Sequence, residues 1–222
     1  MSQTTGAAQL LPYLDRVTHG DCIAVLANLP PACVDLVVTD PPYLVGYRER
    51  NGRPVGNDDN DAWLLPAFRA VARVMKAHSL CASFYGWPHA DRFLSVWKAC
   101  GLRPVSHLVW LKSYTCRAGY TQTRHETGYL LAKGRPPLPE DPPPDMLPWS
   151  YTGNRTHPTQ KPVAALLPLI RAYSRPGDIV LDPFAGSGST GFAARNCGRR
   201  FILIEKEAWH CESVNRRIER GQ

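Results

Sequence analysis

The sequence contains no apolar run close to the roughly 18 residues that a membrane-spanning helix needs. Its apolar stretches are short, and the one at 163–170 is interrupted by a proline. The first nine residues, 1–9, also lack the basic and apolar regions of a secretion signal. These absences exclude the transmembrane classes, and we expect a cytoplasmic protein that has no membrane among its partners.

Metal and nucleophile motifs are equally scarce. The seven cysteines are odd in number and include no Cys-x-x-Cys pair, which is the usual start of a zinc site. We therefore predict reduced, mostly buried thiols and no bound metal. No Walker phosphate loop and no Ser-His-Asp arrangement is evident either. The chemistry of this chain has to come from other residues.

The composition fits one soluble globular unit. The 222 residues are 44% hydrophobic and 20% charged, which is enough to bury a full core, and we predict a single domain over residues 1–222. Lys and Arg number 26 against 19 Asp and Glu, a net charge of +7. Such an excess of positive charge favours an anionic partner, for example a nucleic acid.

A glycine-containing turn lies between a short apolar run at 178–181 and a helix-compatible run at 190–196. Glycines let the backbone approach a ligand closely, and the N–H groups at the start of the following helix point at the same place. This pattern predicts a cofactor cradle, with a bare structural turn as the alternative. The predicted cofactor-binding residues of the turn are Asp182, Phe184, Ala185, Gly186, Ser187, Gly188, Ser189 and Thr190.

A second carboxylate strengthens the cofactor interpretation. Glu205 ends the apolar run 201–204 and follows Asp182 by 23 residues. In nucleotide-binding folds, an acidic residue about 20 residues beyond the glycine turn binds the ribose hydroxyls. A nicotinamide oxidoreductase is disfavoured, because the third glycine of this turn, Gly191, lies a turn into the helix.

Strand and helix patterns alternate along most of the chain, which predicts a doubly wound, mostly parallel α/β sheet of the Rossmann-like type. The predicted strands are 13–17, 34–39, 80–85, 105–111, 178–181 and 201–204. The predicted helices are 22–29, 64–75, 93–100, 162–173, 190–196 and 208–218. Ligands of such sheets bind beyond the carboxyl ends of the strands.

The predicted strand 34–39 delivers Asp40, Pro41, Pro42 and Tyr43 at its carboxyl end. Proline has no N–H group, so the carbonyl oxygens of this turn are free to accept hydrogen bonds from a ligand. One carboxylate, one free carbonyl and an aromatic ring suit the NH₂ group of a planar base: Asp40 and Pro41 accept its two hydrogens while Tyr43 stacks on the ring. The four residues are the predicted catalytic set, and a turn with a helix-capping Asp is the alternative.

Basic and aromatic residues are interleaved in the segment 112–157, and seven prolines fall within 134–148. Such a proline density disfavours helix and central strand alike, so we predict a stiff surface excursion that contacts phosphates and bases. An ordinary solvated loop is the alternative. A second basic loop is predicted at 44–61. The predicted DNA-binding residues of the two segments are Arg48, Arg50, Arg53, Arg117, Tyr120 and Arg124.

Four separate motifs now combine. Gly20-Asp21-Cys22, Asp40-Pro41-Pro42-Tyr43, His157-Pro158-Thr159-Gln160-Lys161-Pro162 and the turn from Asp182 to Ser189 follow one another along the chain. Together they resemble the beta group of amino-methylating DNA methyltransferases, the N6-adenine/N4-cytosine class, over about residues 14–217. In that group the catalytic motif precedes the cofactor turn, a circularly permuted order that this sequence shares.

The resemblance implies S-adenosylmethionine as cofactor, a seven-stranded sheet and a target base flipped out of double-stranded DNA. It implies that Asp21 and Cys22 lie near the cofactor adenine, that Thr159, Lys161 and Asp40 lie near its methionine part, and that 112–157 is a short target-recognition region. The implied activity is transfer to adenine N6, with cytosine N4 as the alternative and a non-catalytic nucleic-acid-binding module as a third hypothesis. A homodimer is a further expectation, because a second copy could help to hold DNA.

Overall fold

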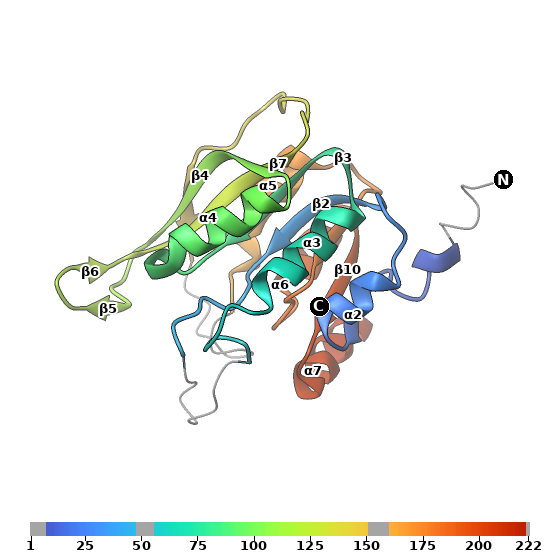
Figure 1. Ribbon diagram of the computed structural model, residues 1–222, viewed down its shortest axis with the longest axis horizontal. Helices are drawn as coiled ribbons and strands as arrows, with labels where there is room; N and C mark the ends of the chain where they lie inside the picture. The colour runs from blue at the N-terminus through green and yellow to red at the C-terminus, as the bar shows by residue number, and fades with distance from the viewer. Residues whose placement is uncertain (1–7, 48–55, 151–159, 221–222) are drawn as a thin grey trace.

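The structure is a computed structural model that describes residues 8–47, 56–150 and 160–220, with only the backbone at 117 and 118 (Figure 1). Its centre is an eight-stranded sheet in the order β1-β10-β9-β2-β3-β7-β4-β8. The strands are β1 Arg16–His19, β2 Val34–Thr39, β3 Met75–Phe84, β4 Leu102–Lys112, β7 His125–Lys133, β8 Met146–Trp149, β9 Ile179–Asp182 and β10 Arg200–Glu205. Strand β7 is antiparallel to both of its neighbours, and the other pairings in this sheet are parallel. The predicted Rossmann-like, mostly parallel sheet is confirmed.

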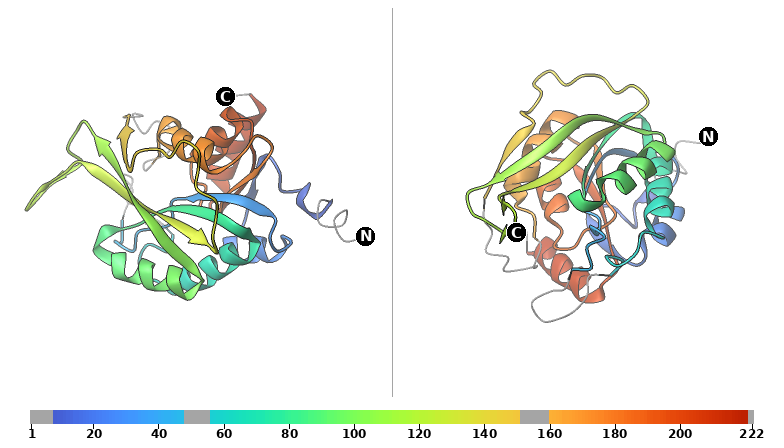
Figure 2. Two further views of the ribbon diagram at one scale, coloured as in Figure 1. Left: turned by 90° about the horizontal axis from the view of Figure 1, so that it is seen from above. Right: turned by 60° about the vertical axis from the view of Figure 1, so that its left-hand side comes forward.

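Helices cover both faces of this sheet, as the left view of Figure 2 shows. Buried residues of α2, α3 and α4 pack in one core on one face, and those of α5, α6 and α7 pack in a second core on the other. The helix bounds are α2 Cys22–Ala27, α3 Leu64–Val74, η1 Trp87–His89, α4 Ala90–Ala99, α5 Val163–Tyr173, α6 Ser189–Asn196 and α7 Ala208–Glu219. The sheet is therefore doubly wound, as the alternating pattern predicts.

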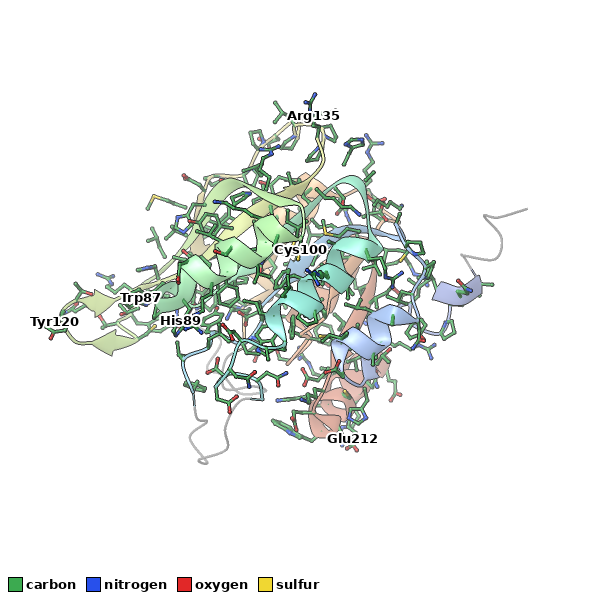
Figure 3. The ribbon with its side chains drawn as sticks, in the orientation of Figure 1. Trp87, His89, Cys100, Tyr120, Arg135 and Glu212 are labelled. Atoms are coloured by element: carbon green, nitrogen blue, oxygen red, sulfur yellow. The ribbon has the colours of Figure 1, made fainter. Side chains whose placement is uncertain are left out.

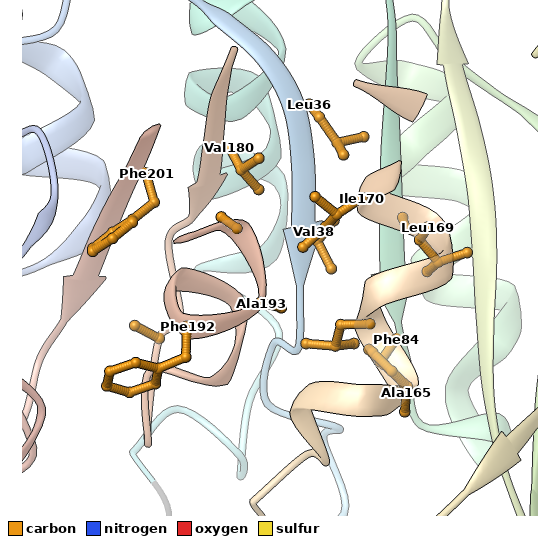
Figure 4. Packing of buried hydrophobic residues seen from close by; sticks show 14 of the residues in the cluster. Leu36, Val38, Phe84, Ala165, Leu169, Ile170, Val180, Phe192, Ala193 and Phe201 are labelled. Carbon is orange, nitrogen blue, oxygen red and sulfur yellow. The ribbon is translucent and has the colours of Figure 1, made fainter. Parts of the chain in front are cut away.

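Strand β2 precedes the predicted catalytic tetrapeptide 40–43 and is buried on both faces. Leu36 and Val38 contribute to the core under α5 and α6, whereas Val34 and Val37 contribute to the core under α2 and α3. Figure 4 shows Leu36 and Val38 beside Ile170 of α5. A strand that is apolar on both faces belongs in the middle of a parallel sheet, and this burial fixes the place where the tetrapeptide emerges.

Three features differ from the sequence-based expectations. The sheet has eight strands instead of seven, because β8 adds to its edge. The predicted first strand 13–17 is shifted, since β1 begins only at Arg16. The predicted excursion is wrong for 125–133, because this segment is β7 and lies inside the sheet between β3 and β4.

Proline explains why β8 lies at the edge. Pro148 stands opposite Leu111 of β4 in the parallel pairing. Among the described residues, β8 has no second neighbour in the sheet. A residue without an N–H group is tolerated at such an edge and disfavoured in a central strand.

A short hairpin, β5 Arg117–Ala118 and β6 Gln122–Thr123, projects from the molecule at the left of Figures 1 and 2. It connects the end of β4 with the start of β7 and forms its own two-stranded sheet. No helix among the described residues has the length and apolar character to cross a membrane.

Candidate active site

A cavity of about 1260 Å³ opens at the carboxyl ends of the parallel strands β1, β10, β9 and β2. Because these strands are parallel neighbours, the residues that follow each of them meet at one edge of the sheet. The cavity is lined by Asp21, Cys22, Asp40, Pro41, Pro42, Tyr43, Lys161, the turn residues 182–187, Ser189, Thr190 and Glu205. Nearly all of the predicted catalytic and cofactor residues that the structure describes therefore share one site.

Asp40 directly follows the C-terminal end of β2, and two neighbouring side chains contact its carboxylate. Lys161 Nζ is 2.7 Å from Asp40 Oδ2, and the Tyr43 hydroxyl donates to Asp40 Oδ1 at 2.8 Å. Lys161 Nζ also donates to the Tyr43 hydroxyl oxygen at 3.2 Å. Behind this turn, a Cβ added to Gly86 would lie 2.3 Å from the Tyr43 carbonyl oxygen, so only glycine allows the close approach.

The contacts extend to strands β4 and β7. The Tyr43 hydroxyl lies 3.4 Å from Glu126 Oε2 at the start of β7, and Glu126 forms an ion pair with Lys112 at the end of β4. The Lys161 ammonium is 4.9 Å from the centre of the Phe84 ring. Two carboxylates and two ammonium groups therefore balance one another in the wall of the cavity.

Burial changes the acidity of these groups. Burial raises the pKa of Asp40, an effect that Lys161 only partly offsets. Glu126 behaves in the opposite way: burial would raise its pKa, but the neighbouring Lys161 and Lys112 hold it below its ordinary value. Burial and the adjacent carboxylates Asp40 and Glu126 raise the pKa of Tyr43 well above its usual range. Asp40 is thus the better proton acceptor of the two carboxylates.

The glycine turn after β9 has the backbone conformation that its sequence predicts. Gly186 and Gly188 have φ angles of 49° and 78°, and a Cβ at Gly188 would lie 2.8 Å from Val214 Cγ1. The Gly186 N–H donates to Glu205 Oε2 at 2.7 Å, and the Glu207 N–H donates to Glu205 Oε1 at 2.8 Å. These bonds aim the carboxylate of Glu205 at the cavity beside the turn.

Asp182 lies beneath this turn and is only 3% exposed. Its Oδ1 accepts from the Thr39 hydroxyl at 2.9 Å and from the Phe184 N–H at 3.1 Å, and its Oδ2 accepts from the Thr190 hydroxyl at 2.8 Å. These bonds tie the end of β2 to the turn, and Asp182 and Thr190 also line the cavity. Burial nevertheless raises the pKa of Asp182 to about 7.

This raised pKa predicts a pH-dependent stability. The ordinary pKa is 3.8, so between about pH 4 and pH 7 the folded chain binds a proton that the unfolded chain has lost. The stabilisation is complete below pH 4 and is lost as the pH rises through 7, at up to about 1.4 kcal/mol per pH unit. Asp182→Asn should remove this slope, so urea unfolding should show the wild type losing stability relative to the variant from pH 4 to 7. Parallel pH profiles would contradict the assignment.

Three further residues that were predicted to bind the cofactor have defined contacts or environments. Asp21 caps α2 by accepting from the Ile23 N–H at 2.9 Å. Burial raises the pKa of the neighbouring Cys22 to about 12, so its thiol stays protonated. The Ser189 hydroxyl donates to the Lys161 carbonyl at 2.7 Å. This bond ties the glycine turn to the residue whose ammonium group pairs with Asp40.

The predicted DNA-binding residues are only partly visible. Arg48, Arg50 and Arg53 lie outside the described residues, as does the predicted cofactor residue Thr159. Arg117 belongs to β5, and Arg124, which precedes β7, is exposed. Tyr120 is fully exposed at the tip of the hairpin, as Figure 3 shows. Tyr120 and Arg124 are not among the residues that line the cavity, whereas Thr115 and Cys116 at the base of the hairpin are.

Sequence reasoning missed several residues that line the site, among them Lys112, Glu126, Trp149 and Trp209. The first three come from β4, β7 and β8, whose segments, from residue 112 onwards, were predicted as an excursion. A usable signal was present, because the apolar run after Glu126 is typical of a strand. Because β7 is antiparallel to β3 and β4, it begins at the end of the sheet where those two strands finish, so its first residues lie beside the site.

Comparison with known proteins agrees with this geometry. A family model described as DNA methylase matches residues 34–216. The chain is 54% identical to YubD, a candidate methylase of Escherichia coli (strain K12), over 86% of this chain and 85% of YubD. It is 30% identical to the DNA adenine methyltransferase YhdJ of the same organism, over 91% of this chain and 82% of YhdJ.

Solved structures share the fold. The M1.HpyAVI–SAM complex has a TM-score of 0.74 at 23% identity and covers 91% of this chain and 98% of its own. The cytosine-N4-specific PvuII DNA methyltransferase has a TM-score of 0.70 at 18% identity and covers 93% of each chain. From the match of the family model and the identity to YhdJ, the chain belongs to the N6/N4 DNA methylase family.

Proposed function

We propose that this DNA methyltransferase uses S-adenosylmethionine to methylate the exocyclic N6 amine of adenine in double-stranded DNA. The observation that carries the proposal is the Asp40 carboxylate, held by Lys161 and Tyr43 in the same cavity as the glycine turn. The base is assigned from the relative YhdJ, which is named as an adenine enzyme. The fold alone does not decide the base, because the PvuII enzyme with the same fold is cytosine-N4-specific.

The residues that line the cavity include groups that suit the cofactor. Glycine is required at Gly188, where a Cβ would collide with Val214, so the turn can pack closely against α7. Glu205 and Asp21 provide carboxylate oxygens for ribose hydroxyls and an adenine amine. Phe184 provides an apolar ring, whose centre lies 5.2 Å from that of Trp63 in an edge-to-face arrangement. When bound, S-adenosylmethionine supplies an electrophilic methyl group.

The chain's own residues orient the amine that is methylated. Asp40 accepts one amine hydrogen and the Pro41 carbonyl accepts the other, which directs the nitrogen lone pair out of the plane of the base. Positive charge then develops on the nitrogen, and the adjacent Asp40 carboxylate stabilises it. Its raised pKa makes Asp40 a better acceptor for the released proton than an exposed carboxylate would be.

The direct test identifies the modified base. DNA incubated with the protein and a deuterated methyl donor is digested to nucleosides and examined by mass spectrometry. Labelled N6-methyl-2′-deoxyadenosine is the expected product. Labelled N4-methyl-2′-deoxycytidine would overturn the adenine assignment in favour of the alternative, and binding without any labelled product would favour a non-catalytic module. Action in the cytoplasm and pairing of two copies stay predictions.

DNA contacts are proposed for the β5–β6 hairpin and the arginines beside it. Each phosphate contact that is lost should flatten the dependence of log affinity on log salt by about one unit. Replacing Arg117 and Arg124 together by Ala should therefore reduce this slope by about one to two units in a fluorescence-anisotropy titration with duplex DNA. A matched control replaces Arg103 and Arg135, since β4 begins and β7 ends at the opposite edge of the sheet. Equal slopes in both variants would place the phosphate track elsewhere.

A further inference from the structure

Glu126 is a partly buried glutamate to which the proposed mechanism gives no role. It lines the cavity at the start of β7, and it is joined to Lys112 at the end of β4 by an ion pair. Lys112 Nζ also contacts Cys116 Sγ at 3.1 Å and lies 5.0 Å from the centre of the Trp149 ring. A carboxylate held this firmly by one ammonium group has a fixed position relative to the tetrapeptide.

The hydroxyl of Tyr43 lies between two carboxylates. It is 2.8 Å from Asp40 Oδ1 and 3.4 Å from Glu126 Oε2, while Lys161 Nζ donates to its oxygen. A phenol has one proton to donate, so it can serve only one of the two acceptors at a time. In the structure the short bond goes to Asp40, and the contact to Glu126 is long for an O–H···O bond.

The target amine needs the acceptor that Tyr43 occupies. When Asp40 accepts an N–H of the base, the Tyr43 proton competes for the same carboxylate. A second acceptor within reach allows the hydroxyl to rotate away without leaving its proton unpaired in a buried place, which would be costly. Glu126 is within reach and is kept ionised by Lys112 and Lys161.

We propose that Glu126 is a positioning residue for methyl transfer: it receives the Tyr43 hydroxyl bond when Asp40 turns to the target amine, and Lys112 holds it there. This inference rests on the proposed function, because it assigns a task to a residue of the same site. The role reaches the reacting nitrogen only through Tyr43 and Asp40. Lys112 and Glu126 also flank the segment that forms the β5–β6 hairpin, so the proposed DNA-contacting element is anchored on this pair.

The test is a double-mutant cycle on single-turnover transfer at saturating donor, measured at high pH where Asp40 is ionised. Glu126→Gln should slow transfer about tenfold or more, which is within the range of couplings between contacting residues. In a Tyr43→Phe background the same change should have almost no further effect on the rate, because the hydroxyl that would donate a hydrogen bond to Glu126 is absent. Glu140→Gln, which removes an exposed acid from the 134–148 segment, is the matched control and should keep the wild-type rate.

The pH dependence supplies a readout that a merely structural role would not change. The charged and titratable groups around Asp40 and Glu126 are Lys161, Tyr43, Lys112, Cys116 and Asp182. The charge of Glu126 raises the pKa of Asp40, so its removal lowers that pKa. The acid limb of the rate profile should therefore move to lower pH in Glu126→Gln, whether or not Tyr43 carries its hydroxyl.

Additive losses in the cycle, or a wild-type rate for Glu126→Gln, would overturn the proposal. An acid limb that stays in place would also count against it. Total label transferred to DNA is counted in each case, whichever base receives it. A cytosine product would therefore refute the adenine assignment and leave the test of Glu126 valid. Thermal unfolding of each variant shows whether a loss of rate reflects a loss of fold.

Discussion

Asp40→Ala should lower the single-turnover rate of methyl transfer by about 100-fold or more while leaving cofactor affinity nearly unchanged. Removing one preorganised electrostatic partner of a developing charge costs rates of this order. The carboxylate lies just beyond the C-terminal end of β2 and contacts Lys161 and Tyr43. It lines the same cavity as the glycine turn. Its removal should affect the chemical step most strongly, because Glu205 and the glycine turn, which we propose hold the donor, remain.

Single-turnover transfer at saturating donor, with calorimetry for the donor, separates these two effects. Asp40→Asn provides an intermediate case, since it keeps one acceptor oxygen and loses the charge. Asp141→Ala, an exposed acid on the loop between β7 and β8, is the charge-matched control. A wild-type rate for Asp40→Ala would mean that Asp40 only supports a turn, and the non-catalytic hypothesis would then lead.

The structure changes what is expected of Tyr43. Stacking on the target base needs only the ring, which on its own predicts that Tyr43→Phe retains much of the activity. The hydroxyl, however, contacts Asp40, Lys161 and Glu126. Loss of the hydroxyl in Tyr43→Phe should therefore slow methyl transfer as well. Tyr43→Ala removes both the ring and the hydroxyl, so the difference between the two variants gives the contribution of the ring.

The fold could be predicted where the apolar pattern of a segment itself indicates which of its faces are buried. Strand β2 reads as buried on both faces, and the structure buries it between two cores. The segment 125–133 was missed because prolines crowd 134–148 immediately after it, and the proline density was extended to its neighbour. Its place between β3 and β4 depends on pairing with residues some 50 positions away, which local patterns do not record.

The candidate site divides in the same way. The glycine turn and Glu205 could be located from spacing alone, because the turn geometry and the following strand are local properties. The ion pair of Lys112 with Glu126 could not, since it forms only when β4 and β7 pair across the hairpin. Asp182 was predicted from its place before the turn, and its three hydrogen bonds, to residues of β2, the turn and α6, could not be.

Glu205→Ala should weaken binding of S-adenosylmethionine by at least about tenfold, and this is the second large effect expected of the site. Charged acceptors contribute roughly 1.5 to 3 kcal/mol per hydrogen bond, before any non-additivity between bonds to the two ribose hydroxyls. The same carboxylate accepts from the Gly186 and Glu207 N–H groups. Its loss therefore also releases the turn that faces the donor, and the decrease in affinity should exceed that of Glu205→Gln, which keeps one acceptor oxygen.

Calorimetric titration of the donor across pH distinguishes a direct contact from a structural one. Burial raises the pKa of Glu205, so this carboxylate takes up a proton at a higher pH than an exposed glutamate does. Protonation turns an acceptor oxygen into a donor. Acidification should therefore weaken binding of the donor at a higher pH than it would with an exposed glutamate. Glu205→Gln carries no ionisable group and should lack this dependence. Glu212→Ala on α7, labelled in Figure 3, is the control that removes a nearby charge from the surface. Unchanged affinity in Glu205→Ala would show that the ribose is held by other residues, with Asp21 as the first to test.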